Sequence, residues 1–128
     1  MPLRTFIIED HPVIRANLIA TLTELADIEV VGCLESETAA QAWLQQHPHD
    51  WDLGIVDLFL RDGTGLGVVA ACQQRSSHQK VVLLSNFAIS EVRQRCLQLG
   101  ADAVFDKSHE VDSLLDYCRM MLRAQITR

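Results

Sequence analysis

The stretch LGIVDL, residues 53–58, is an apolar run of strand length with one acidic residue, Asp57, near its end. A second run, VVLL at residues 81–84, contains no polar residue. Runs that are apolar on both faces are typical of central strands in a parallel sheet, because helices cover both sides of such a sheet. The two stretches therefore predict an α/β fold with a buried parallel sheet at its centre.

Three further strand-length segments lie at residues 4–8, 29–34 and 103–105, and the second central run extends over residues 80–85. The segments between the strands, and residues 111–122 after the last one, carry apolar residues at the spacing of amphipathic helices. Strands recur about every 20 to 30 residues, the length of a strand, a crossover helix and two short loops. The sequence therefore predicts five βα units in a doubly wound, five-stranded parallel sheet with five helices.

Turn and capping residues agree with this division. Pro12 stands where the first helical turn would begin, and Ser36 and Ser90 are expected as N-caps. Gly100 follows the fourth helix, where a C-terminal glycine is expected. Since no linker or low-complexity tract interrupts the pattern, we expect one domain over residues 1–128.

The composition fits a globular protein that stays in water. The chain is 48% hydrophobic and 22% charged, and no stretch approaches the roughly 20 apolar residues that a membrane span needs. Residues 1–10 lack a basic start, a long apolar run and a small-residue cleavage site, so secretion is not expected. We therefore expect a cytoplasmic protein that does not associate with membranes.

Charge and cysteine usage exclude several classes of function. A net charge of -6 has the wrong sign for gripping nucleic acid through its phosphates, so direct nucleic-acid binding is not expected. Cys33, Cys72, Cys96 and Cys118 form no CxxC pair, which argues against a zinc site, a redox motif or a disulfide framework. We expect all four cysteines to be small core residues.

Polar residues cluster at the ends of the predicted strands. Ligands of open parallel sheets bind outside the carboxyl ends of the strands, so these positions are the candidates for a site. The residues there are Glu9, Asp10, Asp57, Ser85, Asp106 and Lys107. Carboxylates from separate strands are thereby expected to meet a hydroxyl and an ammonium group at one edge.

Carboxylates this close repel one another unless a cation lies among them. Mg²⁺ suits the donors, with Asp10 and Asp57 as direct ligands, Glu9 acting largely through water, and one backbone carbonyl. Asp57 could then attack phosphorus as a nucleophile, while Lys107 and the Ser85 hydroxyl stabilise charge on the phosphoryl oxygens. The strand-end residues therefore predict Mg²⁺-dependent phosphoryl transfer to Asp57.

Four motifs resemble a known family. They are FIIEDHP at residues 6–12, IVDL at 55–58, VLLS at 82–85 and GADAVFDK at 100–107. Each is weak alone, but in this order and spacing the set resembles the CheY-like receiver domain of response regulators in two-component signalling, over essentially the whole chain. The resemblance implies the strand order 2-1-3-4-5.

The resemblance also implies roles for individual residues. Asp57 would be the phosphoacceptor, Glu9 and Asp10 the metal-binding acidic pair, and the backbone carbonyl of Phe59 the remaining protein ligand of Mg²⁺. Such a domain catalyses only its own phosphorylation and dephosphorylation and is not otherwise an enzyme. Its partners would be a sensor histidine kinase or phosphotransfer protein, and a downstream effector or output domain.

Switching in the family depends on a serine or threonine and on the lysine. Ser85 would bond a phosphoryl oxygen, Lys107 would pair with Asp57 or its phosphate, and we count Asn86 with the phosphoryl-binding residues. Phosphorylation would then shift the population of a surface formed by the fourth helix, fifth strand and fifth helix. Partners, or a second copy of the chain in a homodimer, would bind that surface.

The chain departs from the family at the aromatic switch position. The position three residues before Lys107 is usually aromatic, and here it is Val104, with Phe105 next to it. The ring is therefore missing or displaced, and the coupling between phosphate and surface is expected to be weaker or to depend on other residues.

The rim of the expected site departs as well. Asn86 stands where the family usually has a small residue, and Phe87 follows it, so access is expected to be narrower. Phe59 is bulky, and Arg61 replaces an expected proline and adds a cation. We expect unusual rates of phosphorylation and dephosphorylation, of undetermined sign.

Two other functions compete with the receiver hypothesis. A pseudo-receiver would keep the fold and signal without phosphate, as the departures at Val104, Asn86 and Phe59 would allow. A haloacid-dehalogenase-like phosphatase would share the strand-end Asp, but it needs a second Asp at the position of Phe59. The cognate kinase, the stimulus, the output and the oligomeric state stay open.

Overall fold

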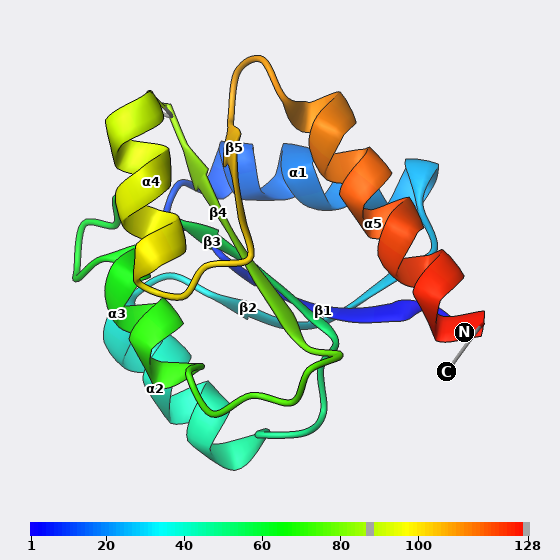
Figure 1. Cartoon of the computed structure of the whole chain (residues 1–128), viewed down its shortest axis with the longest axis horizontal. Coiled ribbons are helices and arrows are strands. Elements are labelled where there is room, and N and C mark those ends of the chain that lie inside the picture. Colours follow the sequence, from blue (N-terminus) through cyan, green and yellow to red (C-terminus); the bar gives the residue numbers. More distant parts are fainter. Residues whose placement is uncertain (87–88, 127–128) are drawn as a thin grey trace.

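Strands and helices alternate along the chain. The computed structural model describes residues 1–86 and 89–126, and five strands alternate with five helices in them (Figure 1). The strands are β1 (Leu3–Ile8), β2 (Ile28–Leu34), β3 (Leu53–Asp57), β4 (Lys80–Ser85) and β5 (Ala103–Asp106). The helices are α1 (Pro12–Leu25), α2 (Glu37–Gln46), α3 (Gly65–Ala71), α4 (Ser90–Gln98) and α5 (Val111–Ile126).

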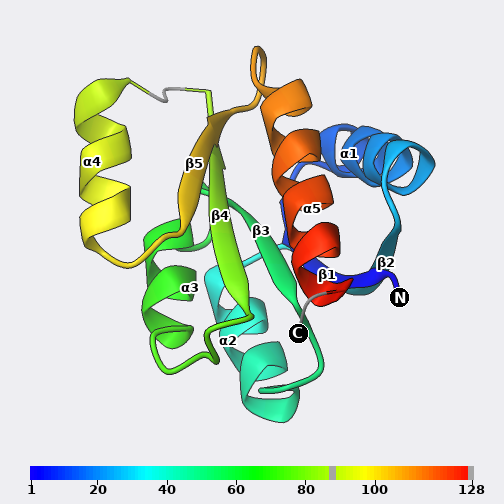
Figure 2. The same ribbon diagram turned by 45° about the vertical axis from the view of Figure 1, so that its right-hand side comes forward.

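The strands form one parallel sheet in the order β2-β1-β3-β4-β5. This order confirms the predicted doubly wound sheet, and each strand ends within one residue of its predicted bounds. Helices α1 and α5 cover one face, and α2, α3 and α4 cover the other (Figures 1 and 2). The central strand β3 is buried along its whole length, as its apolar sequence predicts.

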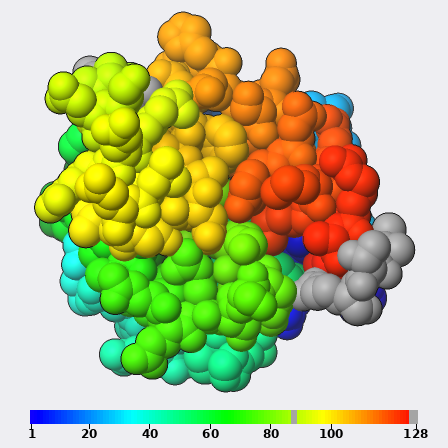
Figure 3. Space-filling view, in the orientation of Figure 1, coloured from blue at the N-terminus to red at the C-terminus, as the bar shows by residue number. Residues whose placement is uncertain are grey.

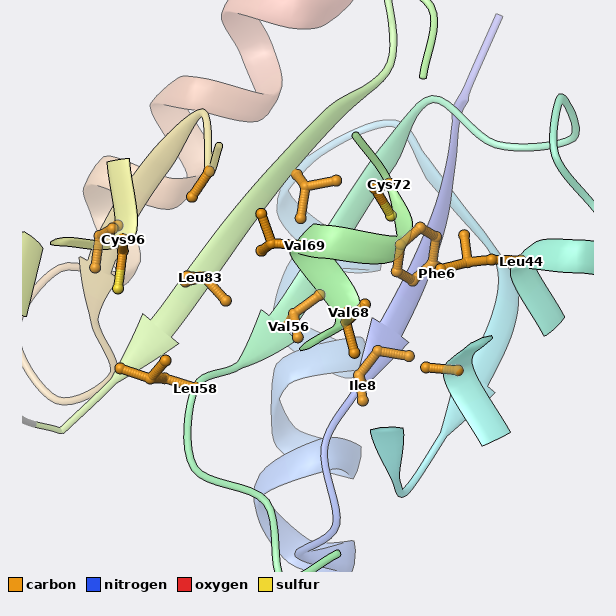
Figure 4. Packing of buried hydrophobic residues seen from close by; sticks show 14 of the residues in the cluster. Phe6, Ile8, Leu44, Val56, Leu58, Val68, Val69, Cys72, Leu83 and Cys96 are labelled. Atoms are coloured by element: carbon orange, nitrogen blue, oxygen red, sulfur yellow. The ribbon is translucent and has the colours of Figure 1, made fainter. Parts of the chain in front are cut away.

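The two faces of the sheet build two separate hydrophobic cores. Successive residues of a strand point to opposite faces. Val56 therefore packs under α2, α3 and α4 (Figure 4), while Ile55 packs under α1 and α5. The Phe6 ring lies across β3 at Gly54, where an added Cβ would stand 2.3 Å from the ring. It meets Trp51 edge-on, with ring centroids 4.8 Å apart. A glycine in the middle of β3 is therefore required by close packing.

The helix ends follow the predicted punctuation with one exception. Pro12 is the first residue of α1, and the Ser36 hydroxyl caps α2. Gly100 follows α4 with a φ of 114°, a conformation that glycine adopts without steric cost. The prediction for Ser90 is wrong, because the N-cap of α4 is Ile89, and no side-chain capping hydrogen bond occurs there among the residues that the structure describes. Ser90 is instead its first helical residue.

The cysteine prediction holds for three of the four residues. Cys72, Cys96 and Cys118 are buried in the cores, whereas Cys33 is exposed. Cys33 lies on β2, an edge strand with a neighbouring strand on one side only, and it is therefore exposed although its neighbours in the sequence are apolar. No helix among the described residues is long and apolar enough to cross a membrane.

Candidate metal and phosphoryl site

The carboxyl ends of β1, β3, β4 and β5 lie at one edge of the parallel sheet, and polar residues stand at or just after each of them. The register pairs Asp57 with Leu84 and Ser85 with Asp106, so the tips of β3, β4 and β5 lie side by side. Glu9 and Asp10 follow the end of β1, which pairs with β3 along its other side. The topology therefore brings together residues that lie far apart in the sequence.

Three carboxylates converge at this edge. Oxygen atoms of Glu9, Asp10 and Asp57 all lie within 4.8 Å of one another. Glu9 is 2% exposed and Asp57 is 6% exposed, while Asp10 is half-buried. Carboxylates held so close and so far from solvent disfavour simultaneous ionisation unless positive charge is nearby.

Lys107 supplies part of that positive charge. Its Nζ lies 2.5 Å from Glu9 Oε1 and 3.1 Å from Asp57 Oδ2, and its side chain is largely buried. Burial alone would lower the pKa of Lys107, but its hydrogen bonds to Glu9 and Asp57 raise that pKa above its ordinary value. One ammonium group faces three carboxylates, so negative charge remains unbalanced.

Asp57 carries the consequence of that imbalance. Burial raises the pKa of Asp57 from 3.8 to about 6, and the nearby Glu9 charge adds to the rise while Lys107 opposes it. The pKa values of both partners are raised, which favours charged Lys107 but disfavours ionised Asp57. Lys107 is shared by two carboxylates and cannot fully compensate either. Ionised Asp57 is therefore held at a free-energy cost that further positive charge would relieve.

The loop between β3 and α3 closes the site on one side. The backbone N–H of Arg61 donates to Asp10 Oδ2 at 2.6 Å, and that of Phe59 donates to Asp57 Oδ1 at 3.2 Å. Burial alone would raise the pKa of Asp10, but the Arg61 hydrogen bond helps to hold that pKa below its ordinary value. The side chains of Phe59 and Arg61 are exposed, so they line the rim.

These donors fit a hard divalent cation. All three candidate side-chain ligands are carboxylates, and the cluster has negative charge left over, which suits an ion with oxygen ligands such as Mg²⁺. No His or Cys belongs to this cluster, so its chemistry differs from that of a zinc site. The cluster is thus able to hold a metal ion.

The comparison that decides the family is a match to the Response regulator receiver domain over residues 5–119. The chain belongs to this family. Receiver domains of this CheY-like type act in two-component signalling, and the matched segment contains the three carboxylates and Lys107.

A curated response regulator resembles this chain over nearly its whole length. The response regulator protein VraR of Staphylococcus aureus is 26% identical over 125 residues, which are 98% of this chain and 59% of VraR. The chain therefore spans about three fifths of the length of this curated relative.

Solved structures share the receiver fold. The signal receiver domain of the putative regulator NarL from Mycobacterium tuberculosis is 24% identical, with a TM-score of 0.77 over 92% of this chain and 97% of that one. The response regulator domain of Thermotoga maritima CheB reaches 0.82 at 16% identity, covering 96% and 98% of the two chains. A chain of the CheX-CheY-BeF₃-Mg²⁺ complex from Borrelia burgdorferi reaches 0.77 at 15% identity, covering 95% and 90%.

The predicted phosphoryl-binding residues of this receiver lie at the tip of β4. Ser85 is fully buried, and its carbonyl accepts the backbone N–H of Lys107 at 3.1 Å, which ties the β4 and β5 ends together. Asn86 is exposed, and its Oδ1 lies 3.5 Å from the Ser108 hydroxyl of the next loop, at the limit of a hydrogen bond. Phe87 lies outside the described residues.

The aromatic ring near the switch position is displaced to the other face of the receiver sheet. Val104 is buried in the core under α4, whereas Phe105 belongs to the core under α1 and α5. The Phe105 ring packs edge-on against Tyr117 of α5, with centroids 5.9 Å apart. Because neighbouring strand residues face opposite sides, Phe105 cannot occupy the position of the missing ring under α4.

Sequence reasoning missed a polar bridge on the α4 side. Arg93 of α4 donates to the Val104 carbonyl at 2.7 Å and forms an ion pair with Glu110, which precedes α5. Glu110 in turn accepts the backbone N–H of Asp106 at 2.9 Å. No local motif marks this bridge, because its members come from α4, β5 and the loop before α5.

Two further residues that make contacts near the acidic edge, Arg15 and Glu37, were also missed. Arg15 of α1 donates to the Glu9 carbonyl at 3.0 Å and to Glu35 at 2.7 Å. Glu37 of α2 accepts the backbone N–H of Thr64 at 2.8 Å. An acidic residue just after a serine cap indicates only a favourable helix-dipole interaction, so no sequence pattern pointed to a role at the site.

Proposed function

We propose that this receiver accepts a phosphoryl group on Asp57 in a Mg²⁺-dependent reaction with a histidine kinase or phosphotransfer protein in the cytoplasm. The observation that carries the proposal is the buried Asp57 carboxylate, grouped with Glu9 and Asp10 within 4.8 Å and paired with Lys107. Its pKa, raised to about 6, belongs to a carboxylate whose ionised form gains from nearby positive charge.

The transfer step is a displacement at phosphorus. A carboxylate oxygen of Asp57 attacks the phosphorus of a phosphohistidine, an O–P bond forms, the N–P bond breaks, and its electron pair stays on the imidazole nitrogen. Bound Mg²⁺ would neutralise charge on the phosphoryl oxygens. Lys107 lies beside Asp57 and would stabilise the same developing charge, as the Ser85 hydroxyl would once a phosphoryl group is present.

Four groups of this chain would hold the ion. They are the carboxylates of Glu9, Asp10 and Asp57 and the backbone carbonyl of Phe59, with Glu9 acting largely through water because Lys107 already pairs with it. Support comes from the oxygen-only cluster and from the Mg²⁺ and BeF₃ of the Borrelia complex, which has a similar fold. Asn86 would contact the phosphoryl group from the loop after β4.

The output would be a change of the surface formed by α4, β5 and α5. These elements adjoin one another on one face of the molecule (Figure 3), where an effector, an output domain or a second copy could bind. Because Val104 supplies no ring, we propose that Arg93 couples this surface to the site through the Val104 carbonyl and Glu110. Phe105 would contribute only by packing on Tyr117.

The two alternatives make different predictions. A pseudo-receiver would bind partners without a phosphoryl group, and the exposed Phe59 and Asn86 at the rim are compatible with it. A haloacid-dehalogenase-like phosphatase would need a second acid where Phe59 stands, so this chain has no general acid for turnover at that position.

The decisive experiment is incubation with acetyl phosphate and Mg²⁺ followed by intact-mass spectrometry. We expect one phosphoryl group on the wild-type chain, none on Asp57→Asn and none with a chelator present. Asp50→Asn, which removes an exposed carboxylate, is the matched control and should be phosphorylated like the wild type.

Other outcomes would identify the alternatives. No adduct with any donor or kinase would favour the pseudo-receiver. Sustained turnover of a generic phosphatase substrate would favour the enzyme. An adduct that persists in Asp57→Asn would show that another residue accepts the phosphoryl group.

A further inference from the structure

The loop between β3 and α3, residues 58–64, is anchored on two opposite sides. On the β1 side, the Arg61 N–H donates to Asp10, and on the α2 side the loop contacts Glu37. We propose that Glu37 is a positioning residue that holds this loop in the geometry in which it serves the metal site. The inference rests on the proposed function, since it concerns the same Mg²⁺ site, but Glu37 itself is not proposed as a ligand.

Glu37 binds the loop at two points. Its Oε1 accepts the Thr64 N–H at 2.8 Å, and its backbone N–H donates to the Asp62 carbonyl at 3.1 Å. Its second carboxylate oxygen accepts Gln41 Nε2 at 3.1 Å, one helical turn further along α2, which fixes the direction of the carboxylate. Helix α2 therefore contacts the loop through a side chain and a backbone group of the same residue.

Two glycines leave the space that Glu37 fills. Gly63 has a φ of 98°, and a Cβ added there would stand 2.3 Å from the Glu37 Cβ. A Cβ added at Gly67, in the first turn of α3, would stand 2.3 Å from the Glu37 carboxylate carbon and from Oε2. The carboxylate reaches Thr64 only because both positions lack a side chain.

The contact at Thr64 is relayed to the metal side of the loop. Thr64 and Phe59 form an isolated antiparallel bridge, so fixing one fixes the residue across from it. Phe59 donates its N–H to Asp57, and its carbonyl is the proposed backbone ligand. Fixing Thr64 therefore orients both the Phe59 carbonyl and the N–H that meets Asp57, as supporting groups do around metal ligands.

The test is a Mg²⁺ titration followed through the amide chemical shifts of Asp10, Asp57 and Phe59. We expect Glu37→Ala to weaken Mg²⁺ binding about tenfold, the effect typical of losing a group that orients a ligand. Glu37→Gln should bind within about twofold of the wild type, because its amide oxygen can still accept the Thr64 N–H. Glu24→Ala, which removes an exposed carboxylate from α1, should leave the affinity unchanged.

A second variant displaces Glu37 without changing it. Gly67→Ala adds a methyl group against the end of the Glu37 side chain, and alanine is a better helix former than glycine. A substitution that favours α3 should thus still weaken Mg²⁺ binding. It also carries the test if Glu37→Ala fails to fold.

Hydrogen exchange of the metal-free protein separates this inference from the proposed function. In Glu37→Ala we expect faster exchange at the amides of Thr64 and Arg61, with the β3 amides unchanged. Unchanged exchange at Thr64, or wild-type Mg²⁺ affinity in both Glu37→Ala and Gly67→Ala, would overturn the positioning role. If Glu37→Gln bound Mg²⁺ as weakly as Glu37→Ala, the positioning role would also be overturned, because the charge of Glu37 and not its hydrogen bond to Thr64 would then determine the affinity. A wild-type chain that binds no Mg²⁺ would overturn the proposed function and this role together.

Discussion

Two aspartates lie at the two ends of the central strand β3, and the pKa values of their carboxyl groups shift in opposite directions. Asp52 precedes β3 and Asp57 ends it, and they are 5% and 6% exposed. Burial alone would raise the pKa of either carboxyl group. Nevertheless the pKa of Asp52 lies below its ordinary value, whereas that of Asp57 rises to about 6. A similar exposed fraction therefore does not decide the charge state, which depends on the balance between burial and the neighbouring groups.

The neighbours of Asp52 are all favourable. Its Oδ2 accepts the Arg4 backbone N–H at 2.9 Å, and the Arg4 guanidinium lies 3.2 Å from Oδ1. Lys107 is the corresponding cation at the other end, but it is divided between Glu9 and Asp57. The amino end of β3 thus stabilises the fold, while the carboxyl end keeps unbalanced charge available for a ligand.

The largest expected effect on the free energy of unfolding comes from removing the Asp52 carboxylate at the amino end of β3. Asp52→Ala should lower the free energy of unfolding by about 2–3 kcal/mol, because it leaves the Arg4 N–H without its carboxylate acceptor. The loss stays below that of a fully buried pair, since the Arg4 side chain is 40% exposed. Urea unfolding at pH 7 measures it. Asp50→Ala, two residues away and exposed, should change stability by less than about 0.5 kcal/mol, and an equal loss there would refute the pairing.

Acid should remove the same stabilisation. The pKa of folded Asp52 lies below its ordinary value of 3.8, so the ionised group stabilises the fold above that value. As the pH falls through 3.8 and then through the lower folded pKa, the contribution is lost. The stability difference between wild type and Asp52→Asn, about 2 kcal/mol at pH 7, should therefore shrink below about pH 4. Comparing the two chains cancels the titration of other carboxylates, and a difference that stays constant down to pH 3 would contradict the shift.

The sequence predicted one end of β3 much better than the other. Runs of apolar residues indicate strands, and parallel strands end at a common edge, so Glu9, Asp57 and Lys107 could be grouped from the sequence alone. Asp52 escaped notice because its partner lies 48 residues away and the pair belongs to no motif. Glu37 was missed for a similar reason, since its contact with Thr64 spans 27 residues.

The two wrong predictions, for Ser90 and Cys33, have different causes. Serine is a common N-cap residue, yet the N-cap of α4 is Ile89 and Ser90 is the next residue. A capping pattern in the sequence cannot locate a helix end to within one residue. Cys33 lies in an apolar run, but the run forms an edge strand whose exposure depends on the strand order. The displaced Phe105 ring follows from strand alternation once Val104 is assigned to the α4 face.

Neutralising Asp57 should change the free energy of unfolding in the opposite direction to neutralising Asp52. In metal-free buffer at pH 7, Asp57→Asn should raise the free energy of unfolding by about 1–2 kcal/mol, because it removes a charge that burial and Glu9 disfavour. The net rise of the Asp57 pKa already includes the opposing contribution of Lys107, so the expected gain is the net of the two effects. Thermal or urea unfolding with a chelator present measures it. A loss as large as that of Asp52→Ala would mean that Lys107 already satisfies Asp57.

Bound Mg²⁺ should balance the negative charge at the carboxyl end of β3 and so stabilise the folded chain. An ion that binds only the folded chain adds about 1.4 kcal/mol of stability at ten times its dissociation constant. We expect this gain, followed by thermal unfolding across a Mg²⁺ series, in the wild type and equally in Asp52→Asn, whose change lies at the far end of β3. Asp57→Asn should gain far less, because a neutral amide replaces one carboxylate of the cluster. An equal gain in Asp57→Asn would place the ion elsewhere, and the surplus negative charge at the carboxyl end would then need another explanation.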